Sequence, residues 1–280
     1  MQQVIVIGDG QSGLSAAHTV VEHGINVLVI DKSAFFGGNS TKATNGINGA
    51  LTRTQREHKI QDIPEIFKEN CMRRGASRPE LVYVLCDESA PAVDWIVGKL
   101  GIDLSLVSRL GGHSMPRTHR GKERFPGMTI TDGVMEQIEE IVENSDKARI
   151  MLNTKATKLV KDKDGHVCGV EAVTKDGKTI REHGFVIIAT GGFGADFADD
   201  SLLGMHRPDL MHLPTTNGDQ QPSGDGLKMT MAVGGECADL ECVQVPPARR
   251  VPTGTRRAWD PSKHPRDARG RFVKKKRRFE

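Results

Sequence analysis

The chain has 280 residues, 37% of them hydrophobic and 27% charged, which suits a globular protein with one sizeable core or two modest ones. No run approaches the roughly 20 apolar residues of a membrane-spanning helix, and no secretory signal precedes the first apolar run at Val4. The net charge of +3 is uneven, because residues 248–280 carry +10 and the rest of the chain carries −7. The pattern predicts an acidic globular body with a basic tail, not a uniformly basic protein.

The five cysteines are scattered along the chain and form no C-x-x-C pair. Their spacing indicates neither a zinc site nor a disulfide framework, and we expect reduced thiols. The expected location is therefore the cytoplasm or an organelle matrix, not the secreted space. A mitochondrial targeting segment upstream is left open.

The first 31 residues have the pattern of a β-α-β unit. Residues 4–7 are a short apolar run typical of a buried parallel strand, and residues 14–23 read as a helix that ends at Gly24. Residues 27–30 form a second apolar run that closes at Asp31. Parallel strands joined in this way almost always have a right-handed crossover.

Three helices are expected next, over residues 63–74, 79–100 and 131–144. Asp62 is the expected N-cap of the first of these helices, and Gly101 is the expected end of the second.

The period then changes from helical to alternating, which predicts an antiparallel β-meander over about residues 150–181. A buried strand at 185–189 and a helix at 227–233 follow. Beyond residue 245 the chain has five prolines, a dense basic end and no apolar period, so we expect residues 248–280 to be disordered.

A glycine fingerprint lies between the first predicted strand and helix. Gly8 permits a tight turn, Gly10 lets the backbone approach a pyrophosphate, and Gly13 lets the helix pack closely on the sheet. The free N–H groups and the positive dipole end of the helix attract phosphates. Asp31 is placed to accept hydrogen bonds from ribose hydroxyls. Because these features occur in register, they predict a nucleotide site more strongly than the glycines alone do.

Residues 37–49 favour FAD over NAD as the nucleotide. This glycine-, asparagine-, serine- and threonine-rich segment directly follows the strand that ends in an acid, where small side chains permit close backbone approach to a long cofactor. The alternative is a flexible surface loop. Two weaker signals agree with FAD: the strand that runs into Thr190-Gly191, and Gly224-Asp225-Gly226, which opens a helix and offers Asp225 to the ribityl chain or flavin.

The chain resembles the flavoprotein subunits of fumarate reductases and succinate dehydrogenases, and more narrowly the soluble fumarate reductase and flavocytochrome c branch. The matching stretches are VIVIGDGQSGLSAA, DKSAFFGGNSTKATNGINGA, LGGHSMPRTHR, VIIATGGFG and GDGLKMTMAVGG through DLECVQV, within residues 2 to about 245. The resemblance implies an α/β fold: a Rossmann-like FAD-binding domain with a parallel sheet and the inserted meander.

The motifs and the resemblance together give a set of expected FAD-binding residues. Ala156 would present its backbone near the adenine, and Gly46 would lie by the flavin, close to where a dicarboxylate substrate binds. The full set is Gly8, Gly10, Ser12, Gly13, Asp31, Lys32, Gly38, Asn39, Ser40, Thr44, Asn45, Gly46, Ala156, Thr190, Gly191 and Asp225. His113, Arg117, His119 and Arg120 match a motif that the resemblance places near the cofactor, and we favour a structural ion-pair and hydrogen-bond cluster over the alternative of direct catalysis.

The implied reaction is reduction of fumarate to succinate by hydride from flavin N5, with an arginine as proton donor and histidine and arginine clamps on the carboxylates. The first clamp should lie in a Gln-x-His-Pro-Thr run, but the chain reads Gln244-Val245-Pro246-Pro247, and no Ala-Glu-x-x-Arg-Gly run follows. We therefore assign no catalytic residue and no metal site.

The pattern breaks where the basic tail begins. We interpret the chain as a truncated form, with an FAD-binding domain over 1–240, the start of a mostly absent capping domain over 241–247, and the tail over 248–280. A frameshift is the favoured origin of the tail. The alternative is a genuine basic tail that contacts nucleic acid or an acidic membrane, although Trp259 and Phe272 offer little base stacking and nucleic acid is not expected.

Two other functions stay open. The chain could be a flavoprotein dehydrogenase of 3-ketosteroid or L-aspartate type, or a non-catalytic FAD-binding protein whose tail binds nucleic acid. The electron donor is not indicated, because no haem motif and no iron–sulfur cysteine cluster occurs.

Overall fold

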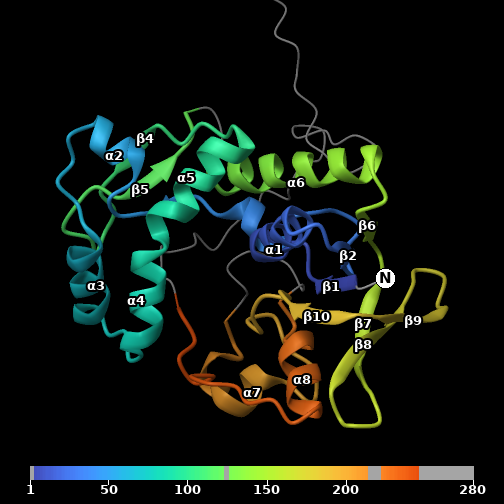
Figure 1. The fold of residues 1–280 in the computed structure, drawn as a ribbon. Coiled ribbons are helices and arrows are strands. Elements are labelled where there is room, and N and C mark those ends of the chain that lie inside the picture. Colours follow the sequence, from blue (N-terminus) through green and yellow to red (C-terminus); the bar gives the residue numbers. More distant parts are fainter. Residues whose placement is uncertain (1–2, 123–125, 214–221, 246–280) are drawn as a thin grey trace, which may run out of the picture. The chain divides into compact units, whose positions relative to one another are not determined.

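The computed structural model describes residues 3–122, 126–213 and 222–245, and the chain divides into two compact units (Figure 1). The Rossmann unit comprises Met1–Gly38 and Ile141–Glu280, and the helical unit comprises Asn39–Glu140. The tail expected over 248–280 lies outside the described residues. The boundaries predicted at residues 240 and 247 stay predictions.

The Rossmann unit is built on a four-stranded parallel sheet of order β10-β1-β2-β6 (Figure 1). Its strands are β1 (Gln3–Ile7), β2 (Asn26–Ile30), β6 (Ala148–Met151) and β10 (Phe185–Ile188). The predicted parallel sheet and its β-α-β start are thereby confirmed.

The antiparallel meander begins later than predicted. It consists of β7 (Lys155–Lys161), β8 (Val167–Val173) and β9 (Thr179–His183). The stretch that begins at Ile150 belongs instead to β6, which pairs with β2 in parallel. A short apolar run does not show whether its strand pairs in parallel or antiparallel. Here the chain reaches β6 through a helix, and parallel strands need such a crossover connection.

The core of the Rossmann unit lies between the parallel sheet and the meander. Helix α1 (Gln11–Glu22) packs against β1 and β2. A buried cluster joins the sheet to the meander and to α8, and its members are Ile5, Ile7, Leu28, Ile30, Ala156, Leu159, Val170 and Met229. Full burial of each isoleucine, leucine, valine or methionine side chain contributes about 1.5–3 kcal/mol to the free energy of unfolding. The other elements of the unit are α7 (Leu202–His206), η2 (Pro208–Leu210) and α8 (Asp225–Ala232).

The helical unit combines helices with a small antiparallel sheet of order β3-β5-β4. Its elements are η1 (Gly38–Lys42), β3 (Ile47–Asn48), α2 (Arg53–Glu57), α3 (Pro64–Arg73), α4 (Pro79–Asp87), α5 (Ser89–Leu100), β4 (Leu106–Ser108), β5 (Thr118–Arg120) and α6 (Pro126–Asn144). Helix α6 begins here and ends in the Rossmann unit. Among the helices in the described ranges, none has the length and apolarity to cross a membrane.

Two helix predictions need correction. The helix predicted over 79–100 is two helices, because Pro91 cannot donate a backbone hydrogen bond to the preceding turn and the Ser89 hydroxyl bonds to the Cys86 carbonyl at 2.7 Å. Gly101 ends α5 in the left-handed conformation, as predicted. Asp62 is not an N-cap: Ile63 holds that position, and the Asp62 carboxylate pairs with Arg117.

Thr52 holds together the start of α2, and its removal should be measurable. Its hydroxyl accepts from the Gln55 backbone N–H in a capping box and contacts His119 Nε2 at 2.8 Å, and the residue is fully buried. We expect Thr52→Ala to lower the free energy of unfolding by about 1–2 kcal/mol. Thr52→Ser keeps the hydroxyl and should recover most of that loss. Urea denaturation of both variants checks this, and an unaffected Thr52→Ala protein would contradict it.

Candidate functional site

The turn between β1 and α1 has room only for glycine at two positions. Gly8 has a φ of +108°, and a Cβ there would lie 2.4 Å from the Ala189 carbonyl oxygen. A Cβ on Gly13 would lie 1.9 Å from the Gly8 carbonyl oxygen. Helix α1 and the end of β10 therefore both pack closely on this tight turn. The close packing of the helix is what the glycine spacing predicted.

The N-terminus of α1 is open to an anion. Gly10 is its N-cap, has extended backbone (φ −67°, ψ 179°) and offers no side chain to cap the helix. The first turn contains no acidic residue, and Ser12 within it is exposed. The first N–H groups and the positive end of the helix dipole can therefore attract an anion, and phosphate binding at this turn stays a prediction.

Asp31 is fixed at the carboxyl end of β2 by the backbone around it. Its Oδ2 accepts from the Asp9 N–H at 3.1 Å, and its Oδ1 accepts from the Ser33 N–H at 2.7 Å. Its own carbonyl accepts from the Thr154 N–H at 2.8 Å. Each carboxylate oxygen can accept two hydrogen bonds and accepts one here, so lone pairs remain for a ribose hydroxyl.

Asp9 is a site residue that sequence reasoning missed. It occupies the variable position between Gly8 and Gly10, and only 1% of it is exposed. Its Oδ1 accepts from the Gly37 N–H at 3.2 Å, while its Oδ2 is buried with no hydrogen-bond partner. Burial, and next the charge of Asp31, raise the pKa of Asp9 to about 8. The signal was present in the sequence as an acidic residue inside a turn that is predicted to bind phosphate.

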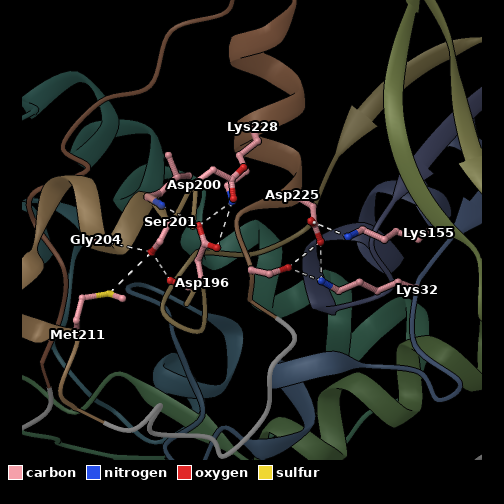
Figure 2. Close-up of polar contacts among 11 residues, drawn as sticks. Lys32, Lys155, Asp196, Asp200, Ser201, Gly204, Met211, Asp225 and Lys228 are labelled. Atoms are coloured by element: carbon pink, nitrogen blue, oxygen red, sulfur yellow. Dashed lines mark hydrogen bonds and ion pairs between the residues drawn. The ribbon is translucent and has the colours of Figure 1, made fainter. Parts of the chain in front are cut away.

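Asp225 lies between two lysines (Figure 2). Its carboxylate is 2.6 Å from Lys32 Nζ and 3.2 Å from Lys155 Nζ, and the Ser223 hydroxyl donates to it at 2.7 Å. Burial raises the pKa of Asp225, but the hydrogen bonds from Lys32 and Ser223 outweigh burial and hold that pKa below its ordinary value. The structure thus joins Asp225 to the residues next to Asp31 and Ala156, the two positions expected at the adenosine end. Its predicted contact with the ribityl chain or flavin stays a prediction.

The end of β10 packs beside the first turn. The Ala189 N–H donates to the Ile7 carbonyl at 2.8 Å, and a Cβ on Gly226 would lie 2.1 Å from Thr190 Oγ1. Ala189 and the Thr190 backbone therefore pack on this turn, and the cofactor role of Thr190 and Gly191 stays a prediction. Gly191 itself has a φ of +73° and open space where a Cβ would point.

A second ionic cluster in the Rossmann unit ties α7 to α8 (Figure 2). Lys228 Nζ lies 3.1 Å from the buried Asp196 carboxylate and 2.9 Å from Asp200. Asp196 Oδ2 also accepts from the Leu202 N–H at 2.8 Å, and Ser201 caps α7 through its hydroxyl. No sequence motif predicted this cluster. Its ion pairs and hydrogen bonds connect α8 to the segment around Asp196 and Asp200 and to the start of α7.

Of the predicted cofactor residues between 38 and 46, Gly38 is the last residue of the first Rossmann segment, and the others lie at the start of the helical unit. Gly38, Asn39 and Ser40 belong to η1, and Asn39 Oδ1 is buried without a hydrogen-bond partner. The Thr44 hydroxyl donates to Asn45 Oδ1 at 3.3 Å. Gly46 has a φ of +114°, and a Cβ there would lie 2.3 Å from the His119 carbonyl oxygen. Packing on β5 is thus sufficient reason for glycine at position 46, and its proximity to a flavin or dicarboxylate stays a prediction.

Two residues of the 113–120 motif are structural, as interpreted from the sequence. Arg117 and Asp62 form an ion pair of 2.8 Å with both side chains fully buried, and the guanidinium lies 4.4 Å from the Phe67 ring centroid. His119 Nε2 contacts the Thr52 hydroxyl, and burial lowers the pKa of His119, which favours the neutral imidazole.

The other two residues of the motif are less engaged. His113 Nε2 lies 3.4 Å from Asn48 Nδ2, and the ring packs edge-on against Phe67. Arg120 Nε is buried without a hydrogen-bond partner. The structure therefore supports the structural interpretation for Arg117 and His119 most directly.

Comparison with known proteins agrees with this geometry. A family described as FAD binding domain matches residues 3–276. This match extends beyond residue 245, the expected end of the sequence resemblance. The chain is 39% identical over 251 residues to a fumarate reductase of Schizosaccharomyces pombe (88% of this chain, 49% of the relative). It is 35% identical over 253 residues to fumarate reductase 1 of Saccharomyces cerevisiae (88% and 53%).

A solved structure has the same fold. The open conformation of a flavocytochrome c3 fumarate reductase superimposes with a TM-score of 0.76 at 30% identity, over 83% of this chain and 40% of that chain. The chain spans about half the length of the curated relatives it matches.

Proposed function

This chain belongs to the FAD-binding domain family, whose cofactor is FAD, and from that membership we propose that it supplies the cofactor-holding part of a flavoprotein oxidoreductase of fumarate reductase type. The identity of 39% and 35% to two fumarate reductases supports the reaction class. Because the chain matches only about half of each relative, the activity of the whole protein remains part of the proposal.

The first turn of the Rossmann unit is the observation that carries the proposal. Gly8 and Gly13 leave no space for a side chain, and the uncapped start of α1 offers N–H groups to a pyrophosphate. Asp31 retains lone pairs for the ribose.

FAD, when bound, supplies hydride transfer, and we propose that the electron acceptor is an unsaturated dicarboxylate such as fumarate. The residues assigned here bind and orient the cofactor. A carboxylate clamp and a proton donor are also needed, and the position where a clamp histidine was expected carries Pro246, outside the described residues. We therefore propose that this chain holds FAD and that turnover requires residues not assigned within it.

Cofactor binding and turnover can be tested separately on the purified chain. We expect a flavin absorbance band, or saturable binding of added FAD with a stoichiometry near one. We also expect fumarate-dependent oxidation of reduced viologen to stay near background, because no residue here is assigned to donate the proton.

The two arms contradict different parts of the proposal. A folded chain that binds no FAD would refute the cofactor assignment. Robust fumarate-dependent turnover would instead show that residues within this chain supply the carboxylate clamp and the proton donor. A full-length fumarate reductase, assayed in parallel, shows that the reduced viologen is competent.

A further inference from the structure

An acidic side chain lies inside the turn that is expected to hold a pyrophosphate. Asp9 follows Gly8 directly and precedes Gly10, the N-cap of α1. It is 1% exposed, and its Oδ2 has no hydrogen-bond partner. A buried carboxylate with a free oxygen is costly, whereas a carboxylic acid at the same place carries no charge.

The groups around Asp9 do not neutralise a negative charge. At the carboxyl end of β2, Asp31 Oδ2 accepts from the Asp9 N–H at 3.1 Å, and the charge of Asp31 raises the pKa of the Asp9 carboxyl. From the segment after β2, the Gly37 N–H donates to Oδ1. The backbone N–H of Asp9 itself is the other group that lowers the pKa of this carboxyl. A carboxyl group buried beside a second carboxylate does not ionise readily, so Asp9 holds a proton at neutral pH.

Bound FAD would raise the electrostatic cost of an ionised Asp9. Its pyrophosphate brings further negative charge to the start of α1, next to the turn that contains Asp9. An ionised Asp9 would repel this charge at short range in a poorly solvated site, and a protonated Asp9 would not.

We propose that Asp9 is protonated and that FAD binds with this proton in place, so that loss of the proton weakens cofactor binding. The inference rests on the proposed function, because it takes the first turn to be the FAD site. In the protonated form no charge is buried at Asp9 Oδ2, the oxygen that has no hydrogen-bond partner.

The pH dependence has a defined sign. The pKa of Asp9 in the folded chain is about 8, so below about pH 7 Asp9 holds its proton and FAD affinity should be nearly constant. Above about pH 8, FAD binding must take up a proton, and the Kd should rise toward tenfold per pH unit. Without the acid at position 9, this dependence should disappear.

The test is the Kd for FAD between pH 6 and 9.5, measured by quenching of flavin fluorescence in the full chain. Asp9→Asn keeps the size of the side chain and removes the titration, and Asp9→Ser is a second variant in case the first folds poorly. Asp146→Asn is the matched control, because Asp146 is exposed on the surface. We expect wild type and Asp146→Asn to lose at least tenfold in affinity between pH 7 and 9.5, and both Asp9 variants to lose less than threefold.

A second readout does not need FAD. Between pH 3.8 and about 8 the folded chain keeps a proton that the unfolded chain has lost, so the free energy of unfolding falls as pH rises through that window. The urea midpoint of the wild type should therefore fall, relative to that of Asp9→Asn, from pH 5 to pH 8.

The outcomes separate the two proposals. A wild type that binds FAD with a Kd independent of pH, or Asp9 variants that keep the wild-type profile, would overturn the protonated Asp9 and leave the FAD site standing. Parallel urea midpoints for wild type and Asp9→Asn would overturn it as well. A folded chain that binds FAD at no pH would refute the proposed function itself.

Discussion

Gly13→Ala should abolish measurable FAD binding and lower the free energy of unfolding by about 3 kcal/mol. The added Cβ would lie 1.9 Å from the Gly8 carbonyl oxygen and 3.3 Å from the Ala189 side chain. Backbone cannot retreat as a flexible side chain can, so α1 must move away from the turn, and overpacking of this kind costs about 1–3 kcal/mol or more. The same shift would displace the N–H groups that are aimed at the pyrophosphate. FAD titration and urea denaturation measure the two effects.

Gly98→Ala is the matched control for this prediction. Gly98 is also a helical glycine, in α5, but a Cβ there would meet nothing within 4 Å. Alanine at an exposed helix position is favoured over glycine by roughly 0.5–1 kcal/mol, so this variant should be slightly more stable and bind FAD normally. A Gly13→Ala protein with normal stability and FAD affinity would show that the turn is not held by this contact.

The Rossmann core was predictable because its signals are local and mutually consistent. Apolar runs gave β1 and β2, and the glycine spacing gave the turn and the start of α1. The direction of β6 was not predictable in this way, because strand pairing is set by the path of the chain between strands.

The helical unit was harder to predict because its polar residues have partners far away in the sequence. Asp62 looked like an N-cap, but it pairs with Arg117, 55 residues later. The break at Glu88 depends on Pro91 and on a serine side chain that bonds the backbone. The small strands β3, β4 and β5 are two or three residues long, too short to show a period.

The candidate site shows the same division. The glycines and Asp31 were identified because each has a fixed role at a fixed spacing. Asp9 was passed over because the fingerprint leaves its position free, and its burial follows from the approach of Gly37. The lysines around Asp225 come from two other segments, so only the folded chain brings them together.

Arg117→Met should lower the free energy of unfolding by about 3–5 kcal/mol, the usual cost of leaving a buried charge without its partner. The Arg117 and Asp62 side chains are both fully buried, and after the substitution Asp62 would keep only the Gln55 amide, at 3.0 Å. Loss of the contact with the Phe67 ring adds to the effect. Urea denaturation of the variant measures it.

Arg53→Ala is the matched control, because Arg53 pairs with Glu57 on the surface with side-chain exposures of 76% and 60%. An exposed pair of this kind contributes less than about 1 kcal/mol. Replacing both buried partners in Arg117→Met/Asp62→Leu should recover most of the stability, since no unpaired charge remains. If Arg117 instead contacts the cofactor, Arg117→Met will fold with nearly normal stability and lose FAD affinity. That result would move the 113–120 motif from the structural cluster to the binding site.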